Sequence, residues 1–284
     1  MRFLLLSILS STFITLIFKL ITRRKIDIFS CIVVNYIVGC LLGFAFANYS
    51  GGFFLTFSFV TAAVIVGILF ILTFRLIGLS TLKSGMGVTS IASKMSLAIP
   101  ITISFIFDSH DTFTPQKAVG VILAIAALAL TTYKKDKSTN GISAFLAPII
   151  LFLAMGVTDS SVKLSQLLVI PSGHNASFTV IVFGISAAIG VATLLFSKRI
   201  GNLKERENWI FGAALGIANY CSLLFFLFAL NSNISSSVIF GINNIGIVIL
   251  SVLIGIIFFK ERLSATNTVG VVTAIISLIY LSTI

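Results

Sequence analysis

Four ionisable residues lie inside long apolar runs of this sequence: Lys19, Lys94, Asp159 and Lys163. A charge near the centre of a bilayer costs several kcal/mol unless it is paired or hydrated, so such residues mark functional sites or interior ion pairs. Lys94 stands about nine residues inside its run, too deep for its side chain to reach an interface easily. Its fixed positive charge could hold a carboxylate or a similar anion. The alternative is a structural ammonium that pairs with a buried carbonyl or with Asp159.

Asp159 and Lys163 are four residues apart, so on a helix they share one face and can neutralise one another. We therefore predict an ion pair, which is either a static strut or a part of the coupling machinery. Asp159 is the only acidic residue in any apolar run, so it is the one interior carboxylate available for proton coupling or for a cationic group of a solute. Lys163 could also reach an interface. Lys19, close to the end of its run, is expected to extend to the interface.

Polar side chains within other runs could exchange hydrogen bonds with a solute. They form three adjacent pairs, Asn35 with Tyr36, Asn219 with Tyr220, and Asn243 with Asn244. Such side chains either join neighbouring helices by hydrogen bonds or face a hydrated cavity. Both interpretations stay open, with interhelical hydrogen bonding favoured for the two Asn-Tyr pairs.

Constellations typical of enzymes are absent from the sequence. His110 and His174 are the only histidines, and neither lies in an HExxH or a Gly-x-Ser-x-Gly context. Cys31, Cys40 and Cys221 lie in apolar runs without CxxC spacing, which indicates core residues rather than a metal site. No Gly-rich phosphate-binding loop appears. We therefore expect no enzymatic activity, no cofactor and no metal.

The elements that position these residues follow from the composition. The chain has 284 residues, of which 58% are hydrophobic and only 10% charged, with a mean hydropathy of +1.16. Soluble domains carry roughly 25% charged residues, so a chain this apolar requires the bilayer as its solvent. A helix crosses the bilayer in about 20 residues, so ten crossings take up about 200 of them and leave no room for a domain outside the membrane.

Ten apolar runs with short polar connections predict an all-α polytopic membrane protein of ten transmembrane helices. The runs cover residues 3–21, 29–47, 53–74, 85–107, 116–133, 142–168, 176–197, 209–230, 235–259 and 266–283. The first run lacks a small-residue cleavage pattern, so we interpret it as a helix rather than a signal peptide. A membrane β-barrel is excluded, because its strands alternate apolar and polar residues. Thr114 before Pro115, and Ser264 before the last run, are expected to cap helix N-termini.

Cationic residues gather in alternate connections. One side has only Arg2 and Lys117. The other side has Arg23, Arg24, Lys25, Arg75, Lys83, Lys134, Lys135, Lys137, Lys198, Arg199, Lys204, Arg206, Lys260 and Arg262. By the positive-inside rule the second side is cytoplasmic, which places both termini outside. The same distribution argues against nucleic-acid binding, because the cations stand singly or in small groups between apolar runs.

The two halves of the chain resemble each other. A shift of 150 residues superposes the identical segments Val119-Gly120-Val121 and Val269-Gly270-Val271, and it places Lys94 on Asn244. Near the starts of the halves, a shift of 144 places Lys19 on Lys163. Five helices in each half invert the second copy relative to the first, and inverted repeats are typical of transporters. We predict a first repeat over 1–133, a cytoplasmic linker over 134–141 and a second repeat over 142–284.

The sequence from Gly255 through Glu261 to Gly270 is similar to a pattern of the drug/metabolite transporter superfamily, EamA-type. A weaker similarity to the same pattern lies in the first half, at Pro100 and Gly120. The sequence departs from the pattern at Leu250, where the family often has Pro. The resemblance implies movement of a solute, often metabolite or amino-acid export, by alternating access through a central cavity.

These observations together predict a secondary transporter in the plasma (inner) membrane. Its solute is expected to be a small polar metabolite, an amino acid or a related anionic or zwitterionic compound, with export as the expected direction and proton or ion coupling left open. Its partners are then the solute and the lipid bilayer. Two alternatives remain: a sugar or nucleotide-sugar carrier, in which Tyr36 or Tyr220 would stack on the solute, and a membrane scaffold without transport.

Overall fold

The computed structural model describes residues 2–46, 55–100, 102, 115–132, 141–171, 174–230 and 236–282. Within these ranges the chain forms ten α-helices and one short 3₁₀ helix, with no strand. The helices are α1 (Arg2–Arg23), α2 (Ile28–Phe46), α3 (Phe57–Ser84), α4 (Met86–Met95), α6 (Pro115–Thr132), α7 (Gly141–Leu168), α8 (Asn175–Phe196), η1 (Ile200–Lys204), α9 (Arg206–Leu230), α10 (Ser236–Phe259) and α11 (Ala265–Ser282). The predicted all-helical class and the order of ten helices are confirmed.

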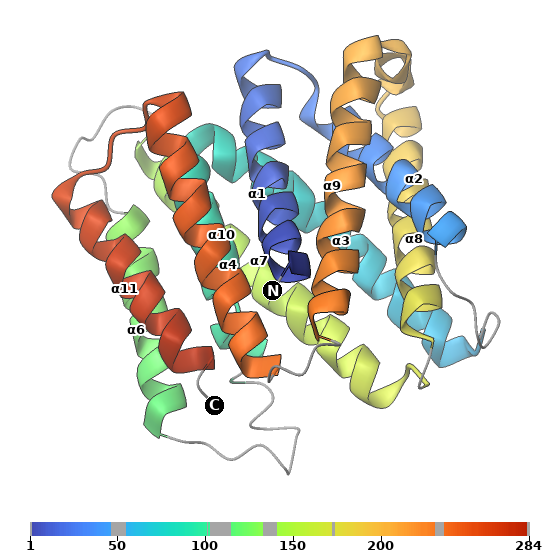
Figure 1. Ribbon diagram of the computed structural model, residues 1–284. Helices are drawn as coiled ribbons and strands as arrows, with labels where there is room; N and C mark the ends of the chain where they lie inside the picture. Colours follow the sequence, from blue (N-terminus) through green and yellow to red (C-terminus); the bar gives the residue numbers. More distant parts are fainter. Residues whose placement is uncertain are drawn as a thin grey trace.

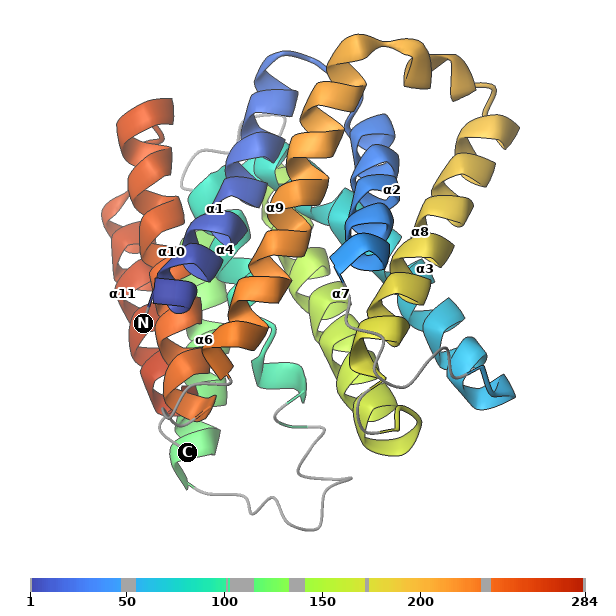
Figure 2. The same ribbon diagram turned by 45° about the vertical axis from the view of Figure 1, so that its right-hand side comes forward.

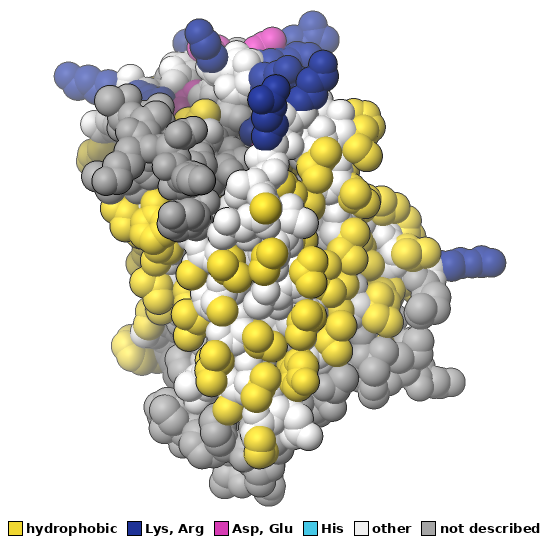
Figure 3. All heavy atoms as spheres, turned by 90° about the vertical axis from the view of Figure 1, so that its left-hand side faces the viewer, with side chains coloured by type: hydrophobic (Ala, Val, Ile, Leu, Met, Phe, Trp, Pro, Cys, Tyr) yellow, Lys and Arg dark blue, Asp and Glu magenta, His cyan; other side chains and the backbone are white. Residues whose placement is uncertain are grey.

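Seven of these helices are long and apolar enough to cross a membrane, namely α1, α2, α3, α7, α8, α9 and α10. The described apolar stretches of α6 and α11 are shorter, at Ala118–Thr132 and Ala265–Leu281, and α4 has only 10 residues. Large apolar side chains are exposed along the bundle, and Figure 3 shows them as a belt below an end where Lys and Arg side chains gather. This surface is that of a membrane protein.

Two helix boundaries differ from the sequence-based expectation. The third helix was expected to end near residue 74 but continues to Ser84, because Arg75 is exposed on its outer side and does not interrupt it. It ends at Gly85, which has a φ of +96°, a conformation that glycine adopts without steric cost. The fourth helix was expected over 85–107 but is interrupted after Met95, at Ser96 and Leu97, and residues 98–100 and 102 are helical again. The expected cap at Ser264 is confirmed, because its hydroxyl accepts a hydrogen bond from Asn267 N–H, whereas Thr114 lies outside the described residues.

A proline inside α7 is accommodated by a neighbouring helix. Pro148 cannot donate the hydrogen bond that would satisfy the carbonyl of Ala144, four residues earlier. The hydroxyl of Ser84, at the end of α3, donates to that oxygen at 2.6 Å. Membrane helices tolerate proline where a side chain satisfies the freed carbonyl in this way.

Close antiparallel contacts between helices are made at glycines. A Cβ on Gly120 of α6 would lie 2.7 Å from Leu281 of α11, and a Cβ on Gly270 of α11 would lie 2.6 Å from Thr131 of α6. Figures 1 and 2 both show α6 and α11 side by side at one edge of the bundle. Since the start of each helix meets the end of the other, the pair is antiparallel.

The pair α2 and α8 is built in the same way at the other side of the bundle. A Cβ on Gly43 of α2 would meet Val180 of α8 at 2.7 Å, and a Cβ on Gly190 of α8 would meet Val33 of α2 at 2.6 Å. Helix α1 packs between α9 and α10, and α7 packs against α3 and α4. The main buried core joins residues from all ten helices, and Ala127 of α6 and Ala274 of α11 extend it to the α6–α11 edge.

The ends of the bundle differ in charge. Helices α1, α8 and α10 end at the cation-rich end, and each is followed by a lysine with positive φ: Lys25, Lys198 and Lys260. Cations are favourable at helix C-termini, where unpaired carbonyls carry negative partial charge. In Figure 1 helix α1 runs toward this end and α11 runs away from it. Of the predicted linker 134–141, only Gly141, the first residue of α7, lies within the described residues.

Candidate functional site

Helix α4 ends inside the bundle because of Pro100. A proline at position 100 of a continuous helix would clash with the carbonyl of Ser96 and could not donate to it. The backbone instead tightens: Leu97 N–H donates to Lys94 O at 3.4 Å, and Ile99 N–H donates to Ser96 O at 2.9 Å. Lys94 therefore lies in the last turn of a short helix. Discontinuous helices of this kind form the solute and ion sites of many transporters.

The Lys94 side chain is partly buried, and among the described residues its ammonium makes no hydrogen bond. It interacts electrostatically with the carboxylate of Asp159, on α7. The structure thus joins two of the predicted site residues, Lys94 and Asp159, from two helices.

Asp159 is held near the break in α4. Its Oδ2 accepts a hydrogen bond of 3.4 Å from the hydroxyl of Ser96, which is fully buried. Helix α7 comes close to α4 at this level because Gly156 leaves room for Ile99. Among the ion pairs within 4 Å in the described part of the chain, Asp159 is paired with neither Lys94 nor Lys163, and it interacts with Lys94 at longer range. The pairing of Asp159 with Lys163 stays a prediction.

Asn243 and Asn244 lie on α10, at about the depth of Lys94. Gly87 of α4 packs against Val252 of α10, and the two helices run in opposite directions. A rise of 1.5 Å per residue places Lys94 about 10 Å beyond Gly87, roughly level with the Asn pair. Both amides are buried, and Asn243 Oδ1 has no hydrogen-bond partner within the described part of the chain. This unpaired acceptor is a second polar group at the level of Lys94.

The two Asn-Tyr pairs lie elsewhere in the bundle. Asn219 of α9 donates a 3.3 Å hydrogen bond to Asn35 of α2, so these amides join two helices. Tyr36 is fully buried among Phe74 and other aromatic rings, and its hydroxyl donates to Phe70 O at 2.8 Å. Tyr220 is partly buried. The structure does not bring these four residues to Lys94.

A further polar cluster was not expected from the sequence. The ammonium of Lys19 pairs with Glu261 at 2.6 Å, so Lys19 does not simply extend to the interface as expected. The Glu261 carboxylate also accepts hydrogen bonds from Met86 N–H, at the start of α4. The signal that could have revealed this cluster is the spacing of Gly255 and Glu261, which the family resemblance had already brought out.

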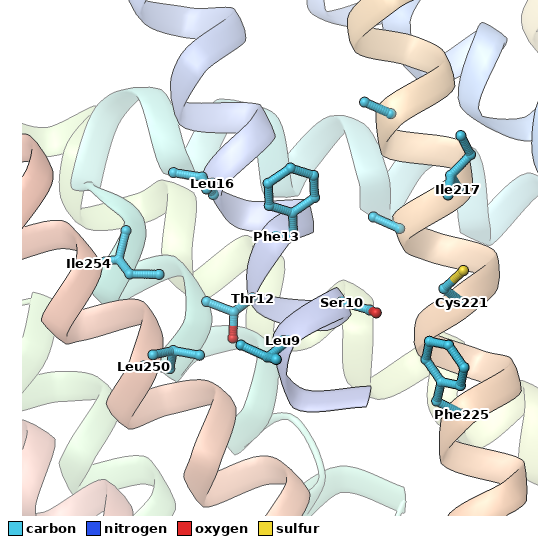
Figure 4. Close-up of a pocket in the computed structure, with 12 residues that line it drawn as sticks. Leu9, Ser10, Thr12, Phe13, Leu16, Ile217, Cys221, Phe225, Leu250 and Ile254 are labelled. Atoms are coloured by element: carbon cyan, nitrogen blue, oxygen red, sulfur yellow. The ribbon is translucent and has the colours of Figure 1, made fainter. Parts of the chain in front are cut away.

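An apolar groove of about 500 Å³ runs along the outside of α1, between α9 and α10 (Figure 4). Leu9 and Phe13 of α1, Phe225 of α9 and Leu250 of α10 are among its lining residues. None of the predicted site residues lines it. Within the described residues there is also no group of three His, Cys, Asp or Glu side chains that could hold a metal ion.

Comparison with known proteins identifies a protein of similar fold but none with a described function. No protein-family model matches the chain. An uncharacterized protein of Haemophilus influenzae is 26% identical over 300 aligned positions, which cover 100% of this chain and 99% of that protein. One crystal structure of a protein has a TM-score of 0.60 at 12% sequence identity and covers 97% of this chain and 98% of its own. The chain therefore shares its fold with a protein of known structure.

Proposed function

We propose that this protein is a secondary transporter that moves a small polar metabolite across the plasma membrane by alternating access. The observation that carries the proposal is the short helix α4, which ends inside an otherwise apolar bundle and holds Lys94 near Asp159 without a hydrogen bond to its ammonium among the described residues. A static core would be expected to satisfy such a charge with hydrogen bonds. A site that binds and releases an anionic group needs an available cation.

An inverted repeat of two five-helix halves is part of this proposal. In a repeat related by a two-fold axis, a contact between two equivalent helices must occur twice, with the partners exchanged. The contact of Gly120 with Leu281 becomes that of Gly270 with Thr131 when each residue is replaced by its counterpart at a shift of 150. The two α2–α8 contacts at Gly43 and Gly190 are exchanged by a shift of 147. These reciprocal contacts support the repeat and its antiparallel arrangement.

We place the chain in the drug/metabolite transporter superfamily, EamA-type. Ten helices support this assignment, as does the structural use of the motif residues. Gly255 leaves space for the Glu261 carboxylate, and Gly270 allows α11 to approach α6. The transport mode, however, is argued from the site rather than from the fold, because one fold can serve several functions.

In the proposed mechanism, Lys94 binds the carboxylate of an amino acid or related compound. Asn243 and Asn244 contribute hydrogen bonds from α10, in the opposite repeat. Asp159 balances the Lys94 charge when the site is empty, so that the cation is released from this interaction when the solute binds. The same carboxylate is the candidate for proton coupling. Lys163 lies one turn further along α7 and belongs to the rim of the site.

The alternatives are less well supported by the geometry. A sugar carrier that depends on aromatic stacking needs an available ring face, but Tyr36 is fully buried and packs against Phe74 and Phe183. In a scaffold all interior polar groups would join helices, as Asn35 and Asn219 do. Lys94 differs from these amides, because its ammonium makes no hydrogen bond to another helix within the described residues.

The test is uptake into proteoliposomes preloaded with unlabelled solute, measured with radiolabelled glutamate, leucine, lysine and glucose. We expect exchange of at least one amino acid. Lys94→Ala is expected to reduce this exchange more than tenfold, because the fixed cation at the site is lost. Lys83→Ala is the matched control, since Lys83 is an exposed lysine near the end of α3, and it should leave exchange unchanged.

Other results would favour another function. Exchange of glucose that survives Lys94→Ala would favour the sugar carrier. Folded protein that exchanges none of the four solutes, and that none of them stabilises against heat, would favour the scaffold.

A further inference from the structure

The carboxylate of Glu261 fills a space that exists because two neighbouring residues, Gly85 and Gly255, have no side chain. Helix α10 ends at Phe259, and Lys260 adopts a φ of 54°, which turns the chain back so that Glu261 N–H donates to Gly255 O at 2.9 Å. A Cβ on Gly255 would lie 2.7 Å from Glu261 Oε2, and a Cβ on Gly85 would lie 2.9 Å from both carboxylate oxygens. Any side chain at either position would displace the carboxylate.

In this position the Glu261 carboxylate connects three helices, α1, α4 and α10. Its Oε1 pairs with Lys19, in the last turns of α1, at 2.6 Å. Both oxygens accept from Met86 N–H, the first residue of α4, at 3.0 and 3.2 Å. Backbone N–H groups at a helix start have no partner within the helix and carry positive partial charge, so a carboxylate is favourable there. Glu261 thus holds the ends of α1 and α10 against the start of α4.

Three buried hydroxyls lie one helical turn inward from this contact. Thr81 is four residues before Gly85, Ser90 is four residues after Met86, and Ser251 is four residues before Gly255. Their exposed fractions are 0%, 1% and 0%, and within the described residues their hydroxyl oxygens have no hydrogen-bond partner. Buried hydroxyls without partners are unfavourable in a dry core, but they become favourable once water reaches them.

We propose that Glu261 is the latch of a gate at the cation-rich end of the solute path, and that the hydroxyls of Thr81, Ser90 and Ser251 line the passage that opens when the latch is released. This inference rests on the proposed transport function, since a gate requires a path. The closed form is stabilised by the carboxylate contacts, and the open form by hydration of the three hydroxyls. Two forms with compensating interactions are what alternating access requires.

The test is the accessibility of Ser90→Cys to a membrane-impermeant maleimide. The chain first receives Cys31→Ala, Cys40→Ala and Cys221→Ala, so that the introduced thiol is the only one. Vesicles of both orientations are labelled. With Glu261 intact, we expect slow labelling. Glu261→Gln, which keeps the size and removes the charge, is expected to raise the labelling rate about tenfold or more, and only from the cation-rich end.

Asp27→Asn is the matched control, because Asp27 forms the other ion pair of the described residues, with Arg199 at 2.8 Å. It removes a carboxylate at the same end of the bundle without touching α4, so the labelling rate should stay unchanged. If Glu261→Gln does not yield folded protein, Lys19→Met weakens the latch from its other side and carries the same prediction with a smaller increase.

A charge exchange separates a latch on α4 from a simple ion pair. The double variant Lys19→Glu with Glu261→Lys restores the two opposite charges but places an ammonium against the N–H of Met86, where a cation is unfavourable. We expect labelling to remain fast in the double variant. Slow labelling in it would mean that the Lys19–Glu261 pair alone closes the structure, and would overturn the role of α4.

An unchanged labelling rate in both Glu261→Gln and Lys19→Met would overturn the gate even if the protein exchanges amino acids. Faster labelling in a protein that exchanges none of the tested solutes would support the gate and contradict the proposed amino-acid solute instead. The two failures are therefore distinguishable.

Discussion

Lys94 and Asp159 interact across two helices, and the sequence had offered this interaction only as one of several interpretations of Lys94. Spacing rules describe neighbours on one helix, so they paired Asp159 with Lys163, four residues away. Whether Lys94 comes near enough to interact with Asp159 depends on how α4 lies against α7. What the sequence did provide was the list of interior charges, because each of them interrupts an apolar run.

A double-mutant cycle tests the coupling of this pair. Lys94→Gln and Asp159→Asn each leave one interior charge without its counterpart, so each should lower the melting temperature by about 5 °C, on the order of 2 kcal/mol. The melting temperature of the double variant should fall by less than the sum of the two single decreases, because neither interior charge remains. Additive losses would show that the two charges are independent.

Asp27 lies in the turn between α1 and α2 and gives the protein a pH-dependent stability. Burial alone would raise the pKa of its carboxyl above the ordinary 3.8. Hydrogen bonds from Ser30 at 2.6 Å and Asn202 at 3.0 Å, together with the charge of Arg199, outweigh burial and lower the pKa. Because the pKa is lower in the folded state, this stabilisation is present above the unfolded value and is lost as the pH falls through the folded value.

Asp27→Asn is therefore expected to lower the melting temperature at pH 7 by about 2 °C, on the order of 1 kcal/mol, since the pair is partly exposed. As the pH falls below 3.8 toward 2 the difference should shrink, because the stabilisation is lost as the pH falls through the lowered pKa of the folded state. Glu207→Gln, at an exposed position of α9, is the control and should have little effect at either pH. A difference that persists unchanged at pH 2 would contradict the assignment.

At the scale of the helix, we expect alanine substitutions at Gly120 and Gly270 to lower the stability of the protein by different amounts. A Cβ on Gly270 would lie 2.8 Å from the backbone nitrogen of Thr131, whereas a Cβ on Gly120 meets the side chain of Leu281 first. A side-chain tip can move aside more cheaply than a backbone can. Gly270→Ala should thus be more destabilising than Gly120→Ala, by about 1 kcal/mol within the 1–3 kcal/mol typical of overpacking.

Thermal unfolding in detergent measures this difference, with Gly201→Ala as the control. A Cβ on Gly201 has no atom within 4 Å, so that variant should retain the wild-type melting temperature. Equal losses in Gly120→Ala and Gly270→Ala would mean that α6 and α11 can separate freely.

The positions of the helices could be predicted from apolar runs, but their ends could not. The order of ten helices was correct, since a run of about 20 apolar residues has few alternatives in a bilayer. The break in α4 was missed because Leu97 to Ile99 are as apolar as the helix around them, and only Pro100 marks the interruption. Helix α10 has Leu250 at the position that the proposed repeat pairs with Pro100, and it runs unbroken from Ser236 to Phe259.

Pro100→Leu makes the first half resemble the second at this point. We expect α4 to continue beyond Met95, so that the amides of Leu97 and Ile99 exchange with deuterium more slowly. Because the end of α4 would move away from Lys94, transport of amino acids into preloaded proteoliposomes should fall more than tenfold, although the protein still folds. Unchanged amide exchange would show that Pro100 is not the cause of the break.

At the scale of the whole molecule, the charge distribution predicts the orientation. Lys and Arg side chains gather at one end of the bundle (Figure 3), and α1 runs toward that end whereas α11 runs away from it (Figure 1). Alkaline phosphatase, which is active only outside the cytoplasm, should thus be active when fused after Ile284. The same enzyme inserted after Lys135 should be inactive, and the reverse pattern would invert the orientation.

The opposite charges of Lys94 and Asp159 have a consequence for the membrane potential. A carrier whose empty site holds one cation and one carboxylate moves no net charge when it reorients. Its return step should therefore be indifferent to voltage. A bound monoanion adds one negative charge, and each elementary charge that crosses the full field is worth about 2.3 kcal/mol per 100 mV. Voltage would then act on the loaded carrier alone, and an interior-negative cell would drive such anions outward without any second ion.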